Sequence, residues 1–508
     1  MAARTGQSGK KSKPAAPIKG ARLARGGKRP SPRRKAAKAA RRSRRRRPRA
    51  RKPPKTPLPK AAALALLPAA LAHVALHGNT QWQPLALALA GLCWTWSSQP
   101  SLSQRWEQTR GLLAAWLPGA FLPTTDSSFV KTLAKATDRL AAPLLEHLRR
   151  VALAEGSARR VAGREVFAID GTKVAVPWTA DNEARLGEGT LAGRKRRRGK
   201  PRRRQAKRRS ANSKAHDAVR PQLLLTLLWH VASGLPWAWR KDPIGGSERA
   251  AALALLVLLP ARALLVGDAG FTGYDFWNGV RKAGHDFVLR IGSNVRLLEG
   301  LGWRCEVRGR LAYLWPQEQQ RRREPPLVVR LATFKTARTT VWLATSLLDA
   351  NEISDAEIAA LYRQRWGLEG WFRSLKQTFD KRKMLSKTAA HAECELEWSI
   401  LALGLAQAHG VEALRAAGAR PHELSEAAAL TALRTTALQR DFGRCDLRRL
   451  RDRLAAARRD GYVRKKPKAG RHAHRQKTHL PPGAPQLVRA TPAQRRAAQE
   501  IQAQLGVQ

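Results

Sequence analysis

The sequence predicts a mixed α/β core in which buried strands and one helix bring acidic side chains together. Two short apolar runs end in an acid next to a glycine, Phe167-Ala-Ile-Asp170-Gly and Ala263-Leu-Leu-Val-Gly-Asp268. Apolar runs of this length, bounded by glycine, are typical of buried strands. A helical segment that carries Glu369 follows later in the chain. Strands alternating with helices and closed by a helix form a layered α/β core.

The segments between these acids supply the other elements. Residues 222–232 are a strand-like apolar run, and residues 234–239 are expected to pair with it after a Ser-Gly turn. Ser247 is expected to cap a helix whose first turn contains Glu248, so that both have structural roles. A helix is expected at 273–283 and a strand at 286–291. Short alternating runs at 304–307, 312–315, 327–332 and 340–344 predict a β-rich region around a charged loop, 317–326.

Residues 362–376 place four polar side chains on one face of an expected single helix. Tyr362, Arg365, Glu369 and Lys376 fall within an arc of roughly 60° at about 100° per residue. A neighbouring apolar stripe consists of Leu361, Leu368, Phe372, Leu375 and Phe379. A carboxylate between two cations and a phenol suits a helix that holds a metal ion and grips phosphate. An ordinary amphipathic helix with an Arg365–Glu369 charge pair is the alternative that spacing leaves open.

The order Y-x-x-R-x-x-x-E-x-x-x-x-x-x-K resembles the signature of DDE transposases of the insertion-sequence-four family. The blocks Asp170-Gly-Thr, followed by Pro177, and Asp268-Ala-Gly-Phe are similar to those that carry the family's first two acids. The resemblance covers roughly 165–390 and implies a ribonuclease-H-like catalytic core. It implies that Asp170, Asp268 and Glu369 bind two Mg²⁺ ions, for which Mn²⁺ can substitute.

The same resemblance implies roles for the companions of the acids. Arg365 and Lys376 would clamp phosphates and Tyr362 would orient the terminal nucleotide, while Arg373 is a further expected DNA contact. Some relatives hold a flipped base with an aromatic residue of the β-rich insertion. Trp303, Trp315 and Trp342 are candidates for that role, and core packing is the alternative for each.

Other acids compete with the three proposed ligands. Asp-Gly is a common turn pair, so a turn role is the alternative for Asp170 taken alone. The nearest competitors are Asp181, Glu183, Asp242 and Asp275. Asp275 falls on the expected helix at 273–283 and Asp181 in a loop, so neither would be delivered by the end of a strand.

The basic residues are clustered, and they point to a polyanionic partner. The chain of 508 residues has a net charge of +59, which excludes an ordinary metabolic enzyme. Residues 1–60 carry 24 Lys and Arg and no acid, so this arm is expected to be disordered. Residues 194–209 carry 12 more within a predicted insertion, 191–215. Its Arg196, Arg197, Arg203 and Arg204 are expected to contact the DNA backbone rather than bases.

The remaining segments complete the expected domain organisation. A helical, DNA-binding N-terminal region is expected at 61–160, with an amphipathic helix at 128–155. The catalytic core would take 161–291 and 346–400, the β-rich insertion 292–345, and a helical, basic region 401–508. The apolar stretch 61–78 contains Pro68 and is too short to span a membrane, and the basic arm is too long for a signal peptide.

Isolated cysteines favour a reducing compartment. Cys93, Cys305, Cys394 and Cys445 have no C-x-x-C spacing and are expected to be reduced thiols in a cytoplasmic, nucleoid-associated protein. A metal site at His472, His474 and His479 is a weaker alternative to a plain basic tail.

The resemblance thus implies a cut-and-paste DNA transposase. It would act on double-stranded DNA, both transposon ends and target, as a homodimer assembled on the DNA and without a membrane. Two other classes stay open: a domesticated, catalytically inactive DNA-binding protein derived from a transposase, and a nucleic-acid-compacting basic protein. The intact set of three acids argues against the first, and the second leaves the middle of the chain unexplained.

Overall fold

The computed structural model describes residues 66–156, 160–187, 220–303, 310–336, 339–438, 447–460 and 483–505. All of them belong to one compact unit, Lys55–Gln508. Several predictions lie outside the described residues: the basic arm at 1–60, the strand at 304–307, Arg196, Arg197, Arg203, Arg204, Cys305, Cys445, His472, His474 and His479.

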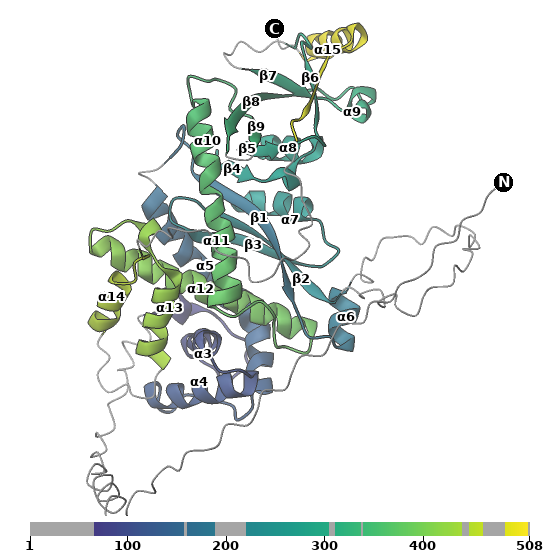
Figure 1. The fold of residues 1–508 in the computed structure, drawn as a ribbon. Helices are drawn as coiled ribbons and strands as arrows, with labels where there is room; N and C mark the ends of the chain where they lie inside the picture. Colours follow the sequence, from purple (N-terminus) through teal and green to yellow (C-terminus); the bar gives the residue numbers. More distant parts are fainter. Residues whose placement is uncertain are drawn as a thin grey trace, which may run out of the picture. The chain divides into compact units, whose positions relative to one another are not determined.

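The described residues form a mixed α/β fold built on a ten-stranded sheet (Figure 1). The strand order is β10-β6-β7-β8-β9-β5-β4-β1-β2-β3. The strands are β1 (Val166–Ala175), β2 (Gln222–His230), β3 (Leu235–Pro243), β4 (Leu264–Gly267), β5 (Asp286–Ile291), β6 (Arg296–Glu299), β7 (Leu311–Leu314), β8 (Leu327–Lys335), β9 (Thr340–Thr345) and β10 (Gln486–Arg489).

Strand β1 lies at the centre of the half that carries the acids. It pairs antiparallel with β2 and parallel with β4, and β4 pairs parallel with β5. Its first four residues, 166–169, are buried and apolar, as expected for a strand covered on both faces. The pairing of β1 with β4 ends where Ile169 lies opposite Gly267. Asp170 and Asp268 follow directly on neighbouring strands.

The other half of the sheet continues from β5 without interruption. Strand β9 pairs antiparallel with β5 and with β8, and β7 joins β8 to β6. The expected β-rich region therefore extends the same sheet. Trp315 is buried there, and its indole nitrogen donates a hydrogen bond to the carbonyl of Glu324 at 2.8 Å. Trp342 is half-buried against the core, with the Arg310 guanidinium 5.4 Å from its ring centroid.

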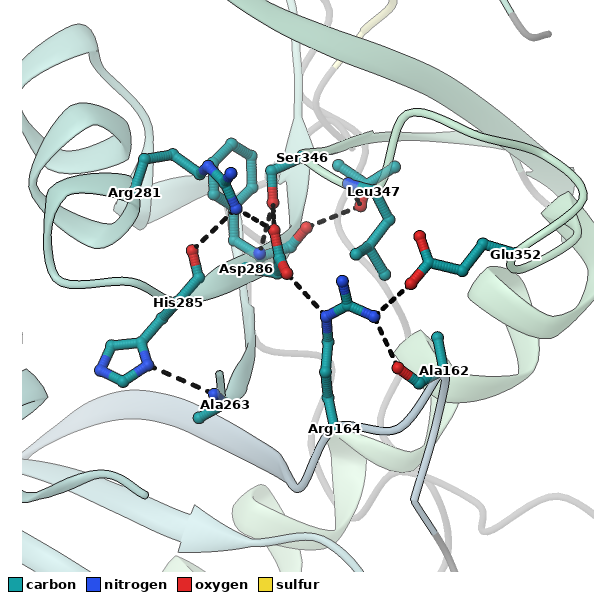
Figure 2. Close-up of polar contacts among 11 residues, drawn as sticks. Ala162, Arg164, Ala263, Arg281, His285, Asp286, Ser346, Leu347 and Glu352 are labelled. Carbon is teal, nitrogen blue, oxygen red and sulfur yellow. Dashed lines mark hydrogen bonds and ion pairs between the residues drawn. The ribbon is translucent and has the colours of Figure 1, made fainter. Parts of the chain in front are cut away.

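A buried polar network holds the amino-terminal ends of β1 and β5 together (Figure 2). Arg164, just before β1, pairs with Asp286 at 2.6 Å and also with Glu352. The Ser346 hydroxyl donates to Asp286 at 2.8 Å, and Arg281 pairs with the same carboxylate. Because β1, β4 and β5 are parallel, this network lies at the end of the strands opposite to Asp268.

Helices from both ends of the chain form one layer. Helices α3 (Pro84–Trp96), α4 (Leu102–Trp116) and α5 (Asp126–Gly156) pack with α12 (Ala389–Ala416), α13 (Glu426–Leu433) and α14 (Leu447–Ala455). The amphipathic prediction for 128–155 is confirmed, because its apolar stripe is buried throughout: Phe129, Leu133, Leu140, Leu144 and Leu148. No helix among the described residues has both the length and the apolarity needed to cross a bilayer.

The remaining helices flank the sheet. They are α6 (Ala180–Leu186), α7 (Glu248–Leu255), α8 (Tyr274–Lys282), α9 (Gln317–Arg321), α10 (Asp355–Gln364), α11 (Trp366–Arg373) and α15 (Pro492–Gln504). Ser247 caps α7 as expected, since its hydroxyl accepts from the Ala250 amide. The strand β10 lies in a region for which only helix was expected.

The prediction of one regular helix over 362–376 was wrong. The segment divides into α10, α11 and a π-helical turn, Ser374–Thr378, with Arg365 at the first junction. Regular spacing of 100° per residue therefore fails at the second joint, since a π-turn accommodates an extra residue. Lys376 lies in that turn, so its direction does not follow from the helical arc.

Candidate active site

The sheet brings two acids to neighbouring positions. Asp170 lies within β1, and its carboxylate accepts a hydrogen bond from the Gly171 amide at 2.8 Å. Asp268 follows β4 directly and caps a short 3₁₀ turn, with its carboxylate accepting from the Gly270 amide at 2.7 Å. The apolar runs before both acids are buried strands, which is why their positions are well defined.

Helix α11 adds Glu369 through a shared arginine. The Arg365 guanidinium is 3.0 Å from the Glu369 carboxylate and 3.5 Å from that of Asp170. Arg365 is buried, with 5% of its surface exposed. A buried cation between two carboxylates draws them together while partly cancelling their repulsion. Glu369 thus faces the same place as Asp170.

The electrostatics of Asp170 are favourable for binding a cation. Burial, followed by the charge of Asp268, raises the pKa of Asp170 to about 6, and Glu369 contributes in the same direction. The Gly171 amide and Arg365 oppose this rise without cancelling it. Carboxylate oxygens are the ligands that Mg²⁺ and Mn²⁺ prefer. A half-buried acid with two acidic neighbours therefore fits a divalent metal ion.

Of the two other polar residues of the predicted face, Tyr362 is buried, whereas Lys376 contacts β1. Tyr362 is buried, and its hydroxyl finds no hydrogen-bond partner in the described part of the chain. The Arg365 guanidinium lies 5.6 Å from the centroid of its ring. The Lys376 ammonium donates to the Thr172 hydroxyl at 2.5 Å, two residues after Asp170. Arg373 is exposed at the end of α11.

A basic groove beside Lys376 was not found by sequence reasoning. The groove has a volume of about 840 Å³, and among its lining residues are Arg105, Lys173, Lys376, Arg382 and Lys383. These residues come from α4, β1, the π-turn and the segment after it, so no local pattern in the sequence connects them all. The adjacent pair Arg382-Lys383 was the one signal available.

The competing acids have structural partners. Asp181 accepts a hydrogen bond from the Ala389 amide at the start of α12, at 2.7 Å. Glu183 accepts from the Trp178 indole at 3.1 Å, and Asp242 pairs with Arg240 at 3.1 Å. Asp275 lies in the first turn of α8, as expected.

One further cluster offers possible metal ligands. His147 of α5 and His409 and Glu412 of α12 each place one ligand atom within 4.8 Å of the others. A guanidinium nitrogen of Arg150 lies 2.8 Å from His147 Nδ1 and can only donate to it. Because the permanent positive charge of Arg150 lies next to His147, this cluster would repel a metal cation. The cluster is better described as a packing link between α5 and α12, in which the ring centroids of His147 and His409 lie 6.0 Å apart.

Comparisons with known proteins show similarity to transposases. A family model described as "Transposase DDE domain" matches residues 162–405. Over 249 residues the chain is 26% identical to "Transposase InsG for insertion sequence element IS4" of Escherichia coli (strain K12), covering 47% of this chain and 50% of that protein. The chain thus spans about half the length of the curated relative it matches.

A solved structure gives a weaker likeness. A cryo-EM structure of a piggyBac transposase synaptic complex with hairpin DNA superposes with a TM-score of 0.37 and 9% identity, covering 74% of this chain and 76% of that one. Agreement at that level is too low to establish a shared fold. The family model and the curated relative support a DDE transposase domain of the insertion-sequence-four type within residues 162–405.

Proposed function

We propose that the chain is a cut-and-paste transposase that cuts DNA at the terminal inverted repeats of a mobile element and joins the freed ends to target DNA. The observation that carries this proposal is the meeting of Asp170 and Glu369 on the buried Arg365, with Asp268 on the neighbouring strand. Asp170, Asp268 and Glu369 are the proposed catalytic and metal-binding residues. The proposed fold of the core is ribonuclease-H-like, supported by the strand order β3-β2-β1-β4-β5 with only β2 antiparallel to its neighbours.

The proposed cofactor is a pair of Mg²⁺ ions, which Mn²⁺ can replace. Asp170 would face both ions, with Asp268 at one and Glu369 at the other. When bound, such a pair activates the attacking oxygen and neutralises charge on the leaving oxygen. The all-carboxylate donor set and the raised pKa of Asp170 support this assignment.

The reaction needs no other co-reactant. In cleavage, the oxygen of water forms a bond to phosphorus and the bond to the 3′ oxygen breaks, leaving a free 3′ hydroxyl and a 5′ phosphate. In joining, that 3′ hydroxyl attacks a phosphodiester of target DNA and releases another 3′ hydroxyl, so the number of phosphodiester bonds is conserved. The fixed positive charge of Arg365 would hold the reacting phosphate against the acids, and Lys376 would bind its neighbour.

The rest of the chain is proposed to bind DNA. Double-stranded ends and target would contact Arg373, the basic insertion with Arg196, Arg197, Arg203 and Arg204, and the basic arm. Residues 61–160 would contribute to recognition of transposon ends, beside the core at 161–291 and 346–400, the β-rich region at 292–345 and the basic region at 401–508. We expect a homodimer on DNA in the cytoplasm, associated with the nucleoid.

Strand cleavage and joining on a duplex with the terminal sequence of the element test the proposal. We expect metal-dependent nicking by the wild type and none by Glu369→Gln, with DNA binding retained in both. Glu357→Gln is the matched control, because Glu357 caps α10 and Gln keeps that capping box. A wild-type protein that binds the duplex but does not cut it in Mg²⁺ or Mn²⁺ would show a domesticated DNA-binding protein instead.

A further inference from the structure

A fourth acid reaches the candidate active site from a different helix. Glu248 is the first residue of α7, and its side chain lies against Gly171, the residue after Asp170. A Cβ atom on Gly171 would lie only 2.5 Å from the nearer carboxylate oxygen of Glu248. That oxygen therefore occupies the space that a side chain at position 171 would take.

The carboxylate of Glu248 lacks the partners that a half-buried charge normally has. No hydrogen bond or ion pair holds it within the part of the chain that the structure describes. Burial, followed by the charge of Asp268, raises its pKa, and the exposed Lys173 opposes the rise only in part. An acid that is partly desolvated beside another acid is unfavourable unless a cation joins them.

The local structure holds Glu248 in this position. Ser247 caps α7, and the neighbouring Arg249 donates a hydrogen bond to the carbonyl of Thr272 at 2.8 Å. Thr272 lies in the segment that follows Asp268, so this bond ties the start of α7 to that acid. A charge at the start of a helix is explained by the helix dipole alone. The dipole does not explain contact with Gly171 or proximity to Asp268.

The end of the β1–β4 pairing lets the acids meet. Successive side chains of a strand point to opposite faces, so Asp170 faces α11 while the space above Gly171 faces α7. Pairing with β4 stops at Ile169, and Asp268 stands beside the open edge that follows. The charge of Asp268 at that edge raises the pKa of both Asp170 and Glu248, so Asp268 connects the acids of the two faces.

We propose that Glu248 is a fourth carboxylate ligand of the divalent-cation site formed by Asp170, Asp268 and Glu369. The proposal rests on the proposed function, since it assumes the cation site of a DDE transposase. Mg²⁺ and Mn²⁺ accept six oxygen ligands, so three acids leave positions that a fourth can fill. Glu248 would approach from the α7 face and Glu369 from the α11 face, gripping the site from both sides of the sheet.

Titration of the full-length, DNA-free protein with Mn²⁺, followed by electron paramagnetic resonance and calorimetry, tests this inference. We compare the wild type with Glu248→Gln, Asp170→Asn and the control Glu357→Gln. We expect Glu248→Gln to weaken at least one Mn²⁺ by about tenfold or more, since affinity follows the number of charged ligands. Asp170→Asn should abolish the binding, and the control should bind like the wild type.

The outcomes separate the inference from the proposed function. If Asp170→Asn loses Mn²⁺ but Glu248→Gln binds it like the wild type, Glu248 is no ligand and the three-acid site stands. If neither change affects Mn²⁺ binding, the cation site itself is misplaced. Glu248→Asp, which keeps the charge but withdraws it by one methylene, should bind Mn²⁺ more weakly than the wild type. If Glu248→Gln does not fold, wild-type affinity in Glu248→Asp overturns the inference.

Discussion

Asp170 is held in an environment that works against its charge. Its raised pKa means that the folded protein keeps this proton between pH 3.8 and about 6, while the unfolded chain has already released it. The folded state is therefore favoured at low pH, and the advantage is lost as pH rises through 6. At neutral pH the metal-free protein carries an unrelieved cost at this position.

Replacement of Asp170 by Asn should therefore stabilise the metal-free protein. At pH 7.5 in the presence of a chelator, we expect the variant to have a higher melting temperature than the wild type. The free energy of unfolding should rise by at most about 3 kcal/mol. At pH 5 the gain should shrink, because the wild-type carboxyl is then largely protonated. Thermal melts at both pH values check this. An Asp170→Asn protein that is less stable than the wild type at pH 7.5 would contradict the assigned environment.

Arg365 should be irreplaceable by lysine. A guanidinium can face two carboxylates at once, whereas an ammonium is a single point charge. We expect Arg365→Lys to lower the rate of strand cleavage by about 10²-fold. The control is Arg363→Lys two residues earlier, where an exposed guanidinium lies 4.6 Å from the Phe334 ring centroid. Equal rates for the two variants in single-turnover cleavage would show that Arg365 only neutralises charge.

At the scale of elements, α11 depends on glycine to approach the sheet. A Cβ on Gly367 would lie 2.2 Å from the ring of Trp229 on β2, whereas a Cβ on Gly370, one turn later, meets nothing within 4 Å. We expect Gly367→Ala to destabilise the protein by about 1–3 kcal/mol through overpacking. Gly370→Ala should be neutral or stabilise α11 by up to about 1 kcal/mol. Denaturant unfolding compares them, and equal losses would refute the close approach.

The link between α5 and α12 should make stability depend on pH. Burial, followed by the charge of His409, lowers the pKa of His147 to about 4. Below the usual pKa of 6.5 the unfolded chain takes up a proton that the folded chain refuses, so the free energy of unfolding should fall from pH 6.5 toward 4. The slope is at most about 1.4 kcal/mol per pH unit, and smaller because the ring is partly solvated.

His147→Leu should flatten that dependence between pH 6.5 and 5. His422→Leu, at an exposed histidine, is the control and should keep the wild-type slope. Urea unfolding at several pH values measures both. If the free energy of unfolding of His147→Leu depends on pH as steeply as that of the wild type, the group responsible is not His147.

Local patterns predicted the elements well where neighbours in sequence decide the structure. The apolar runs before Asp170 and Asp268 and the stripe of α5 report burial directly. The helix with Tyr362 and Lys376 shows the limit. Spacing predicted a shared face, but not that Tyr362 is buried or that a π-turn brings Lys376 to Thr172. Tyr362 packs in a cluster that draws on β1, β4, β5, β8 and β9, and Thr172 lies 204 residues before Lys376. The approach of Glu248 to Gly171 is equally non-local.

At the scale of the whole molecule, net charge should determine how DNA binding depends on salt. The net charge of +59 should make DNA binding fall steeply with salt, because each neutralised phosphate releases counterions. Replacement of Arg196, Arg197, Arg203 and Arg204 by Gln should reduce the slope of log affinity against log salt by about three to four. The reduction should be similar for specific and non-specific duplexes, measured by fluorescence anisotropy. An unchanged slope would mean that these arginines do not contact phosphate.

Strand β6 owes its place in the sheet to a segment made much later. It shares one residue pair with β7, Leu298 with Tyr313, but pairs with β10 along all four of its residues. Helix α15 then buries Ala498 and Ile501 beside Leu298 and Trp315. On the ribosome, domains fold as they emerge, and synthesis adds about 5–20 residues per second. This corner must therefore wait on the order of ten to forty seconds between Glu299 and Gln486, with an open strand edge that a chaperone or another nascent chain can pair with.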